Sequence, residues 1–215
     1  MEEVIEKELK YQLDKEDYIK LNQYLEKKFV KRDYIIQTNY YIDTGDFTLN
    51  KNNITARIRN ILDKKYEFTI KVPKSNNNNI KHASIKKEVS VEIDKVEAEK
   101  LLQNGIWHKD IIDILNKYID FPICYSDFRI IGSLKTERVL YDIKGFNEFL
   151  SIDKSIYLNI QDYEVEWETT ELDKYNEFLL NIFHAAGVSY LKNKSSKNAR
   201  FIMRLNEIMQ EYIKE

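Results

Sequence analysis

The stretch Glu6-Lys7-Glu8-Leu9-Lys10 places two carboxylates and an ammonium group at a spacing of two residues. Successive side chains of a β-strand point to opposite faces, so these three charged groups share one face, while Leu9 and Tyr11 share the other. A single strand with this alternation is usually the solvated edge of a sheet. Repetition of the pattern further along the chain favours a different interpretation.

The same spacing of charged residues recurs in later segments that read as strands. These segments are Arg57-Ile58-Arg59, Glu67-Phe68-Thr69-Ile70-Lys71, Lys86-Lys87-Glu88, Thr136-Glu137-Arg138 and Glu164-Val165-Glu166-Trp167-Glu168. If the strands belong to one antiparallel sheet that curls into a barrel, their charged faces line a common lumen. Helices would then cover the apolar outside of the barrel.

The composition excludes several classes of protein. The chain has 215 residues, of which 43% are hydrophobic and 33% are charged, so it can form one large domain with a real core and a polar surface. The net charge of −2 argues against a general nucleic-acid binder, and any anion site must therefore be built locally. Because no apolar run of about 18 residues and no basic leader is present, we expect no membrane partner and a cytoplasmic location.

Metal chemistry in this chain would have to use carboxylates. Cys124 is the single cysteine, and the three histidines, His82, His108 and His184, are widely separated. Neither residue type therefore offers the spacing of a zinc site. Oxygen ligands favour Mg²⁺ or Mn²⁺.

The chain is expected to fold as a single domain, residues 1–215, with a helical insertion at about 94–120. Other helices are predicted from a cap at Asp14 to about Lys28, from Leu172 to Ala186, and from Ser195 or Ser196 toward the C-terminus. Strands fill most of the remainder. The aromatic residues Tyr40, Tyr41 and Tyr163 are expected to pack in the core beneath helices.

Together with the charged strand segments quoted above, Glu6-x-Glu8-x-Lys10 resembles the defining motif of the CYTH superfamily, the triphosphate tunnel metalloenzymes. Further segments similar to those of the family follow in the family's order over nearly the whole chain: Thr38–Thr44, Ala56–Arg59, Phe68–Lys71, Thr136–Arg138, Tyr157 and Asp162–Glu168. The resemblance implies an α+β fold, an eight-stranded antiparallel β-barrel with helices packed outside, which binds a triphosphate in its tunnel.

The resemblance also implies the residues of the site. One or two ions of Mg²⁺ or Mn²⁺ would be held by Glu6, Glu8, Glu164 and Glu166. Three more carboxylates are candidates for the site: Glu88, Asp153 and Glu168. A triphosphate must be neutralised from several directions, which separate strands could do through Lys10, Arg57, Arg59, Lys71, Lys86 and Arg138.

Two of the basic assignments depend on choices between neighbours. Lys86 is preferred to Lys87 because it shares strand parity with Glu88, although many relatives carry arginine there. Lys197 is preferred to Lys192 and Lys194 as the residue that reaches the tunnel from the last helix. Within the whole basic set, the residues expected to contribute to catalysis as well as to binding are Lys10, Arg57, Arg59, Lys71 and Arg138.

The expected function is metal-dependent hydrolysis of a triphosphate, with inorganic tripolyphosphate giving phosphate and pyrophosphate. Three alternatives stay open: a thiamine triphosphatase, a class IV adenylate cyclase, and a non-catalytic module that binds polyphosphate or a nucleotide. Thiamine would require an aromatic stack, in which neither Trp107 nor Trp167 can be placed from the sequence. The expected partner is a small-molecule triphosphate, without nucleic acid, and the protein is expected to be a monomer or a homodimer.

Overall fold

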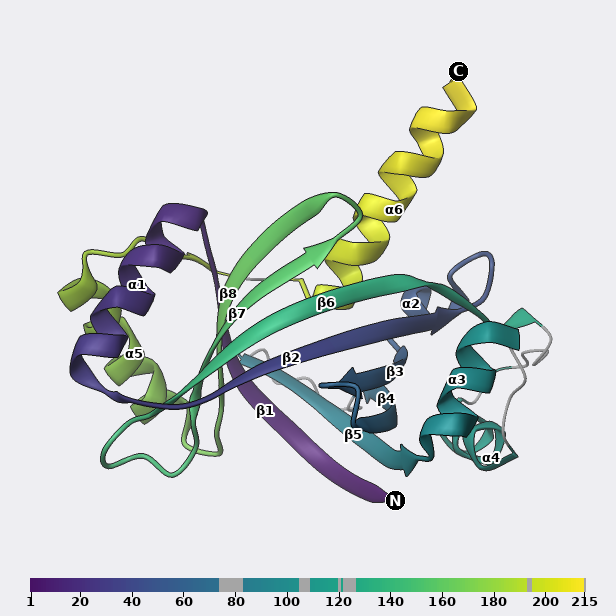
Figure 1. Ribbon diagram of the computed structural model, residues 1–215, viewed down its shortest axis with the longest axis horizontal. Helices are drawn as coiled ribbons and strands as arrows, with labels where there is room; N and C mark the ends of the chain where they lie inside the picture. Colours follow the sequence, from purple (N-terminus) through teal and green to yellow (C-terminus); the bar gives the residue numbers. More distant parts are fainter. Residues whose placement is uncertain (74–82, 105–108, 120, 122–126, 193–194, 215) are drawn as a thin grey trace. The chain divides into compact units, whose positions relative to one another are not determined.

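The structure is a computed structural model that describes residues 1–73, 83–104, 109–119, 121, 127–192 and 195–214 (Figure 1). The strands are β1 (Glu2–Leu13), β2 (Val30–Asp43), β3 (Thr55–Ile61), β4 (Lys65–Pro73), β5 (Ala83–Ile93), β6 (Arg129–Asp142), β7 (Leu150–Tyr157), β8 (Ile160–Glu168) and β9 (Leu191–Lys192). The helices are α1 (Lys15–Lys28), α2 (Thr48–Lys51), α3 (Lys95–Asn104), α4 (Lys109–Tyr118), α5 (Leu172–Ala186) and α6 (Lys197–Lys214). His82, Trp107, His108, Cys124 and Lys194 lie outside the described residues.

The strands form one sheet in the order β5-β4-β3-β2-β6-β7-β8-β1-β9, and β5 also pairs with β1. This last pairing closes the first eight strands of the order, so that neither β5 nor β1 is left as an open edge. Neighbouring strands pair in antiparallel register, with Leu9 opposite Trp167 and Ile58 opposite Phe68. The prediction of an eight-stranded antiparallel barrel with helices is confirmed.

The chain divides into two compact units, each with its own apolar core. Unit 1 consists of Met1–Ile5, Gln37–Ser75 and Lys86–Leu134. Unit 2 consists of Glu6–Ile36, Asn76–Ile85 and Lys135–Glu215. Strands β1, β2, β5 and β6 contribute residues to both units.

In unit 2, α1 and α5 cover the apolar faces of β1, β7 and β8. Leu9 of β1 and Val165 of β8 are fully buried in one core with Leu25 of α1 and Leu179 of α5. Because strand side chains alternate, this packing fixes the opposite face of the same strands as the polar one. Figure 1 shows the two helices side by side.

The ends of these helices follow from local sequence signals. The Asp14 side chain accepts the N–H of Asp17 at 2.8 Å and caps α1, as its position in the sequence predicts. The α5 helix spans the predicted residues and ends at Gly187, whose φ of 63° is a left-handed conformation that costs glycine little. Ser196 accepts the N–H of Ala199 at 3.2 Å at the start of α6, the C-terminal helix.

In unit 1, α3 and α4 pack against β4, which agrees with the helical segment expected at about 94–120. Phe68, Leu101 and Ile111 are fully buried in its core. One expectation for this core is wrong. Tyr41 is buried but belongs to neither apolar core, because it lies opposite Arg57 in the β2–β3 register and therefore shares its polar strand face.

Among the described residues, none of the helices combines the length and the apolar character needed to cross a membrane.

Candidate functional site

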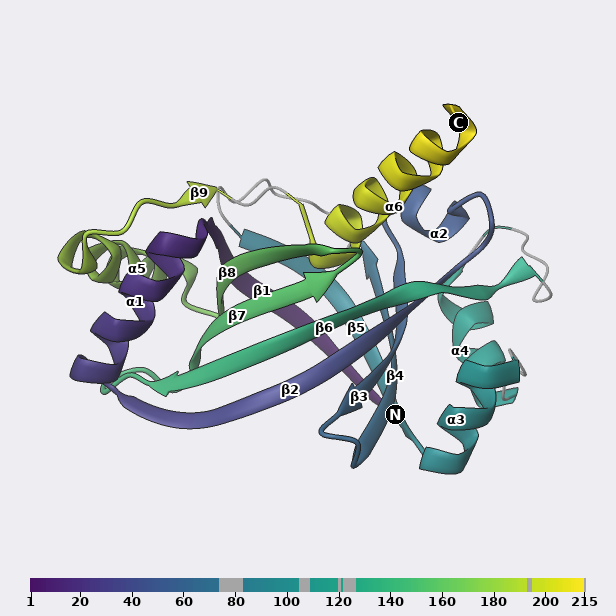
Figure 2. The same cartoon turned by 45° about the horizontal axis from the view of Figure 1, so that its top comes forward.

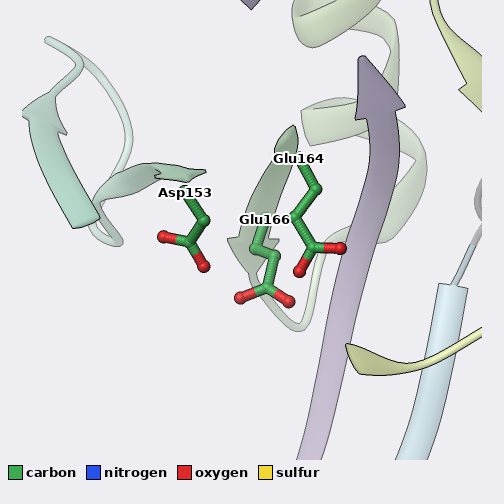
Figure 3. Close-up of side chains that lie close together, drawn as sticks. All are labelled: Asp153, Glu164 and Glu166. Carbon is green, nitrogen blue, oxygen red and sulfur yellow. The ribbon is translucent and has the colours of Figure 1, made fainter. Parts of the chain in front are cut away.

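Three carboxylates converge on the polar face of unit 2 (Figure 3). Asp153 comes from β7, and Glu164 and Glu166 come from β8. Each offers a ligand oxygen, and these oxygens lie within 4.8 Å of one another. Asp153 and Glu164 are fully buried, so their charges must be compensated by protein groups or by a bound cation. This group is called the carboxylate cluster.

The ammonium group of Lys197, the first residue of α6, contacts all three members of the carboxylate cluster. Its Nζ lies 2.8 Å from Asp153 Oδ2 and 2.9 Å from Glu166 Oε1, and it also pairs with Glu164 Oε1. Figure 2 shows α6 beginning beside the turn that joins β7 and β8. The residue chosen from three candidate lysines is therefore on the cluster, whereas Lys194 and the side chain of Lys192 lie outside the described part of the chain.

Two more cations approach the cluster from neighbouring strands. Arg138 of β6 donates to both oxygens of Asp153, at 2.7 and 2.6 Å, and also to Glu166 Oε2. Lys10 of β1 pairs with Glu166 at 2.8 Å and with Glu8 at 2.9 Å. Lys10 and Arg138, two of the predicted site residues, therefore both contact Glu166 of the cluster.

The sequence reasoning missed Arg200 and Asp162 as members of this network. Arg200 donates to Glu164 Oε2 at 2.6 Å and to Asp162 Oδ2 at 2.7 Å. Tyr157 also donates to Asp162, at 2.5 Å. A signal was available, because residues three apart on a helix share a face and Arg200 follows Lys197 by three.

Attraction between oppositely charged side chains outweighs burial and sets the direction of the pKa shifts in the site. Burial alone would lower the pKa of the Lys10 ammonium, but Glu166, Glu8 and Glu164 raise it well above its ordinary value. Burial would raise the pKa of Glu166, but Lys10, Lys197 and Arg138 hold it well below its ordinary range. The pKa of Lys197 is raised as well, because its carboxylate partners outweigh its burial. These groups are therefore charged at neutral pH.

The other predicted metal ligands surround the cluster less closely. Glu8 is buried and its Cα lies opposite that of Glu168, which is exposed. Glu6 is half-buried and shares the strand face of Glu8. None of these three is a member of the carboxylate cluster. Asp153 is a member, although the sequence indicated it only as a further candidate.

The carboxylate cluster fits a divalent cation. All of its ligand atoms are oxygens, which Mg²⁺ and Mn²⁺ prefer. The contacts of the Lys197 ammonium show that the three carboxylates are oriented to surround positive charge. Asp153, Glu164 and Glu166 are thus the residues that would hold such an ion.

Unit 1 carries a second charged group on the polar face of β3, β4 and β5, called the basic strand face. It consists of Arg57, Arg59, Lys71, Lys86 and Glu88. Glu88 pairs with Lys71 at 2.6 Å and lies 4.0 Å from Arg57. Burial would raise the pKa of Glu88, but Lys71 and Arg57 hold it at about 2.

Two arginines of the basic strand face differ in how they are held. The Nε of Arg59 donates to Asn39 of β2 at 3.0 Å. The Nε of Arg57 is buried and has no hydrogen-bond partner within the described residues. A buried donor without a partner is costly, so Arg57 has the most to gain from a bound anion.

The chain belongs to the CYTH domain family, whose model matches residues 4–201. It is 28% identical over 172 residues to YjbK of Bacillus subtilis (strain 168), a protein assigned by name as a triphosphatase, and the match covers 80% of each chain. Family membership was predicted from the ordered strand motifs, and that prediction is confirmed.

Solved structures share this fold. HpAC1 from Hippeastrum, assigned to the adenylyl cyclases and described as having a dominant triphosphatase activity, superposes with a TM-score of 0.79 at 21% identity over 92% of this chain and 95% of its own. A Bacillus halodurans protein assigned to the adenylate cyclases gives a TM-score of 0.75 at 27% identity, over 94% and 99% of the two chains. Triphosphatase activity therefore occurs among proteins of this family and fold.

Proposed function

We propose that this protein hydrolyses inorganic tripolyphosphate to phosphate and pyrophosphate with the aid of Mg²⁺ or Mn²⁺. In the net reaction a water oxygen bonds to the terminal phosphorus, the bridging P–O bond breaks, and pyrophosphate leaves. The observation that carries the proposal is the carboxylate cluster enclosed by Lys10, Arg138 and Lys197, because this combination suits a metal and a polyphosphate chain together.

The cations have a distinct part in this reaction. A divalent ion on the carboxylate cluster would polarise phosphate oxygens and lower the pKa of a bound water. Arg138 presents a fork of N–H donors, and Lys10 presents a compact ammonium, so both can neutralise charge that develops on equatorial phosphate oxygens. Their carboxylate partners orient them before substrate arrives, which reduces the reorganisation needed in the transition state.

The basic strand face of unit 1 is proposed to bind phosphate groups, as the family resemblance implies. The support from unit 1 is Arg57, whose buried Nε has no hydrogen-bond partner in the described part of the chain. Arg59 and Lys71 share its face and supply further positive charge. We also propose Glu6 and Glu8 as metal ligands, because their spacing of two residues places both on one face of β1.

Thiamine triphosphate hydrolysis and a purely binding role receive less support. Trp167 is fully buried among aromatic residues of the unit 2 core, with its Nε1 donating to the Glu148 carbonyl at 2.9 Å, so it cannot stack on a thiazolium or pyrimidine ring. Retention of the carboxylates in the site argues against a purely binding module, because a module that only captures polyphosphate could use the basic residues alone.

A panel assay tests the proposed function. Release of phosphate, pyrophosphate and cyclic nucleotide is measured from tripolyphosphate, ATP and thiamine triphosphate, each with Mg²⁺ and with Mn²⁺. We expect tripolyphosphate to give the highest kcat/KM, with equal amounts of phosphate and pyrophosphate. Cyclic AMP from ATP would establish a cyclase instead, and binding without turnover of any substrate would establish a binding module.

The same proposal includes the setting in which the protein acts. We propose one functional domain, which the family match over residues 4–201 supports because it includes parts of both units. The protein is proposed to act in the cytoplasm as a monomer or homodimer without nucleic acid, in line with its net charge of −2. Light scattering after size-exclusion chromatography measures the oligomeric state.

A further inference from the structure

The contacts of Lys197 extend over the whole carboxylate cluster. Its ammonium group contacts each of the three members of the carboxylate cluster, through Asp153 Oδ2, Glu164 Oε1 and Glu166 Oε1. These side chains are the same ones whose oxygens are close enough together to bind one metal ion. Lys197 and a divalent cation therefore need the same carboxylates.

The carboxylates have further partners besides Lys197. Arg138 donates to Asp153 and to Glu166, and Lys10 also pairs with Glu166. Movement of the Lys197 side chain would therefore leave these carboxylates compensated by strand residues. The Lys197 ammonium sits at the end of a flexible four-carbon stem, so it can move without a change in the backbone.

The start of α6 is held by contacts that do not involve Lys197. Arg200 donates to Glu164 and to Asp162, and its Nη1 donates to the Ser195 carbonyl at 2.9 Å. Phe201 and Ile202 are buried. The helix can therefore keep its position when the Lys197 ammonium changes partners, with Arg200 as the fixed cation and Lys197 as the movable one.

We propose that Lys197 is a tethered cation that competes with the divalent ion for the carboxylate cluster, and that metal binding transfers its ammonium group from the carboxylates to the substrate. This inference rests on the proposed metal-dependent function. It adds a competition between Lys197 and the metal ion, which the spacing of residues along the strands does not predict. Its consequence is that the chain lowers its own affinity for metal when no substrate is present, since only the fraction of molecules with Lys197 displaced can bind the ion.

The first experiment measures Mn²⁺ binding by calorimetry without substrate, in the wild-type protein and in Lys197→Met. Methionine keeps much of the length of the side chain but removes the charge. If the competent fraction in the wild type is about a tenth or less, Lys197→Met binds Mn²⁺ about tenfold more tightly or better. Lys174→Met is the matched control, because Lys174 is an exposed lysine of unit 2 that pairs with Glu171 at 3.2 Å, and its affinity should equal that of the wild type.

The second experiment uses only the wild-type protein, so it does not depend on the folding of a variant. Lysine acylation by an N-hydroxysuccinimide ester is followed by peptide mass spectrometry, with Lys174 and Lys20 as exposed internal references. Without metal, Lys197 should react slowly, because its ammonium is held by three carboxylates. Saturating Mn²⁺ should raise its rate severalfold, and tripolyphosphate added with Ca²⁺ should lower it again.

The outcomes separate this inference from the proposed function. Tighter Mn²⁺ binding in Lys197→Met, with faster acylation of wild-type Lys197 on metal addition, supports the competition. Equal or weaker Mn²⁺ binding in a folded Lys197→Met, or acylation that metal does not change, overturns it while leaving the metal site in place. Absence of Mn²⁺ binding in every protein overturns both the metal site and the competition.

Discussion

The arginine beside the carboxylate cluster of unit 2 and the arginine of the basic strand face of unit 1 differ in how closely carboxylates pair with them. Arg138 makes a two-pronged ion pair with Asp153 and a further contact with Glu166. Arg57 is less exposed than Arg138, but the carboxylate that it pairs with, Glu88, is 4.0 Å away and already pairs with Lys71 at 2.6 Å. Arg138 is held by close ion pairs within the protein, whereas we propose that Arg57 binds an external anion.

This difference reflects the opposite charge requirements of a metal site and of a phosphate site. A site for a metal needs carboxylates, and carboxylates buried together require cations nearby when they are not bound to an ion. A site for phosphate needs cations whose charge the protein does not fully compensate. We propose that the carboxylate cluster and its cations meet both requirements once a metal ion is bound, and that the basic strand face adds cations that are less fully compensated.

The largest expected effect follows the removal of a carboxylate from the cluster. Glu166→Gln should lower kcat for tripolyphosphate by about 10³-fold or more, because it removes a metal ligand and the shared partner of Lys10 and Lys197. Steady-state phosphate release at saturating Mn²⁺ measures the loss. Glu171→Gln, at an exposed glutamate of the same unit, is the control. Activity within tenfold of the wild type would remove Glu166 from the metal site.

Loss of an arginine from the basic strand face should have the next largest effect. Arg57→Ala should lower kcat/KM for tripolyphosphate by about 10²–10³-fold, the range for one electrostatic contact to a transition state. Binding of Mn²⁺ without substrate should stay unchanged, which would distinguish it from Glu166→Gln. Arg32→Ala, at an exposed arginine, is the kinetic control. Wild-type kinetics in Arg57→Ala would mean that this side chain has no contact with substrate.

The stability of two arginine variants tests the comparison directly. Arg138→Ala should lower the free energy of unfolding by about 3–5 kcal/mol, because it leaves Asp153 and Glu166 short of a buried partner. Arg57→Ala should change it by less than about 1 kcal/mol, because its ion pair with Glu88 is long, at 4.0 Å, and Glu88 keeps its close pairing with Lys71. Urea titrations followed by circular dichroism measure both. Equal losses would show that the two arginines are compensated alike.

The smallest expected effect is a pH dependence of stability in unit 1. Glu88 has a pKa of about 2, below its ordinary value of 4.5, so it stabilises the folded state above pH 4.5, and this stabilisation disappears as the pH falls toward 2. At pH 7, Glu88→Gln should be less stable than the wild type by about 1–3 kcal/mol. Urea titrations between pH 7 and pH 2.5 should show the gap closing. A gap that is independent of pH would contradict the charge pairing of Glu88 with Lys71.

The spacing of residues within single strands is what allowed the sequence to predict which charged side chains share a face. The parity of Lys10, Glu164 and Glu166 is a local property, since any strand sends alternate residues to one face. The expectation for Tyr41 was wrong because it followed the aromatic residue type and not the alternation of side chains along the strand. Parity was the stronger signal, since the Cα register places Tyr41 opposite Arg57.

The sequence by itself determined the family and the antiparallel barrel, because the motifs that indicate both lie within short segments. Tertiary structure decided which charges meet. Asp153 became a member of the carboxylate cluster through the register of β7 with β8, and Arg200 joined through the docking of α6. Such contacts join residues far apart in the chain, and their geometry depends on how helices pack onto the closed sheet, which no local pattern encodes.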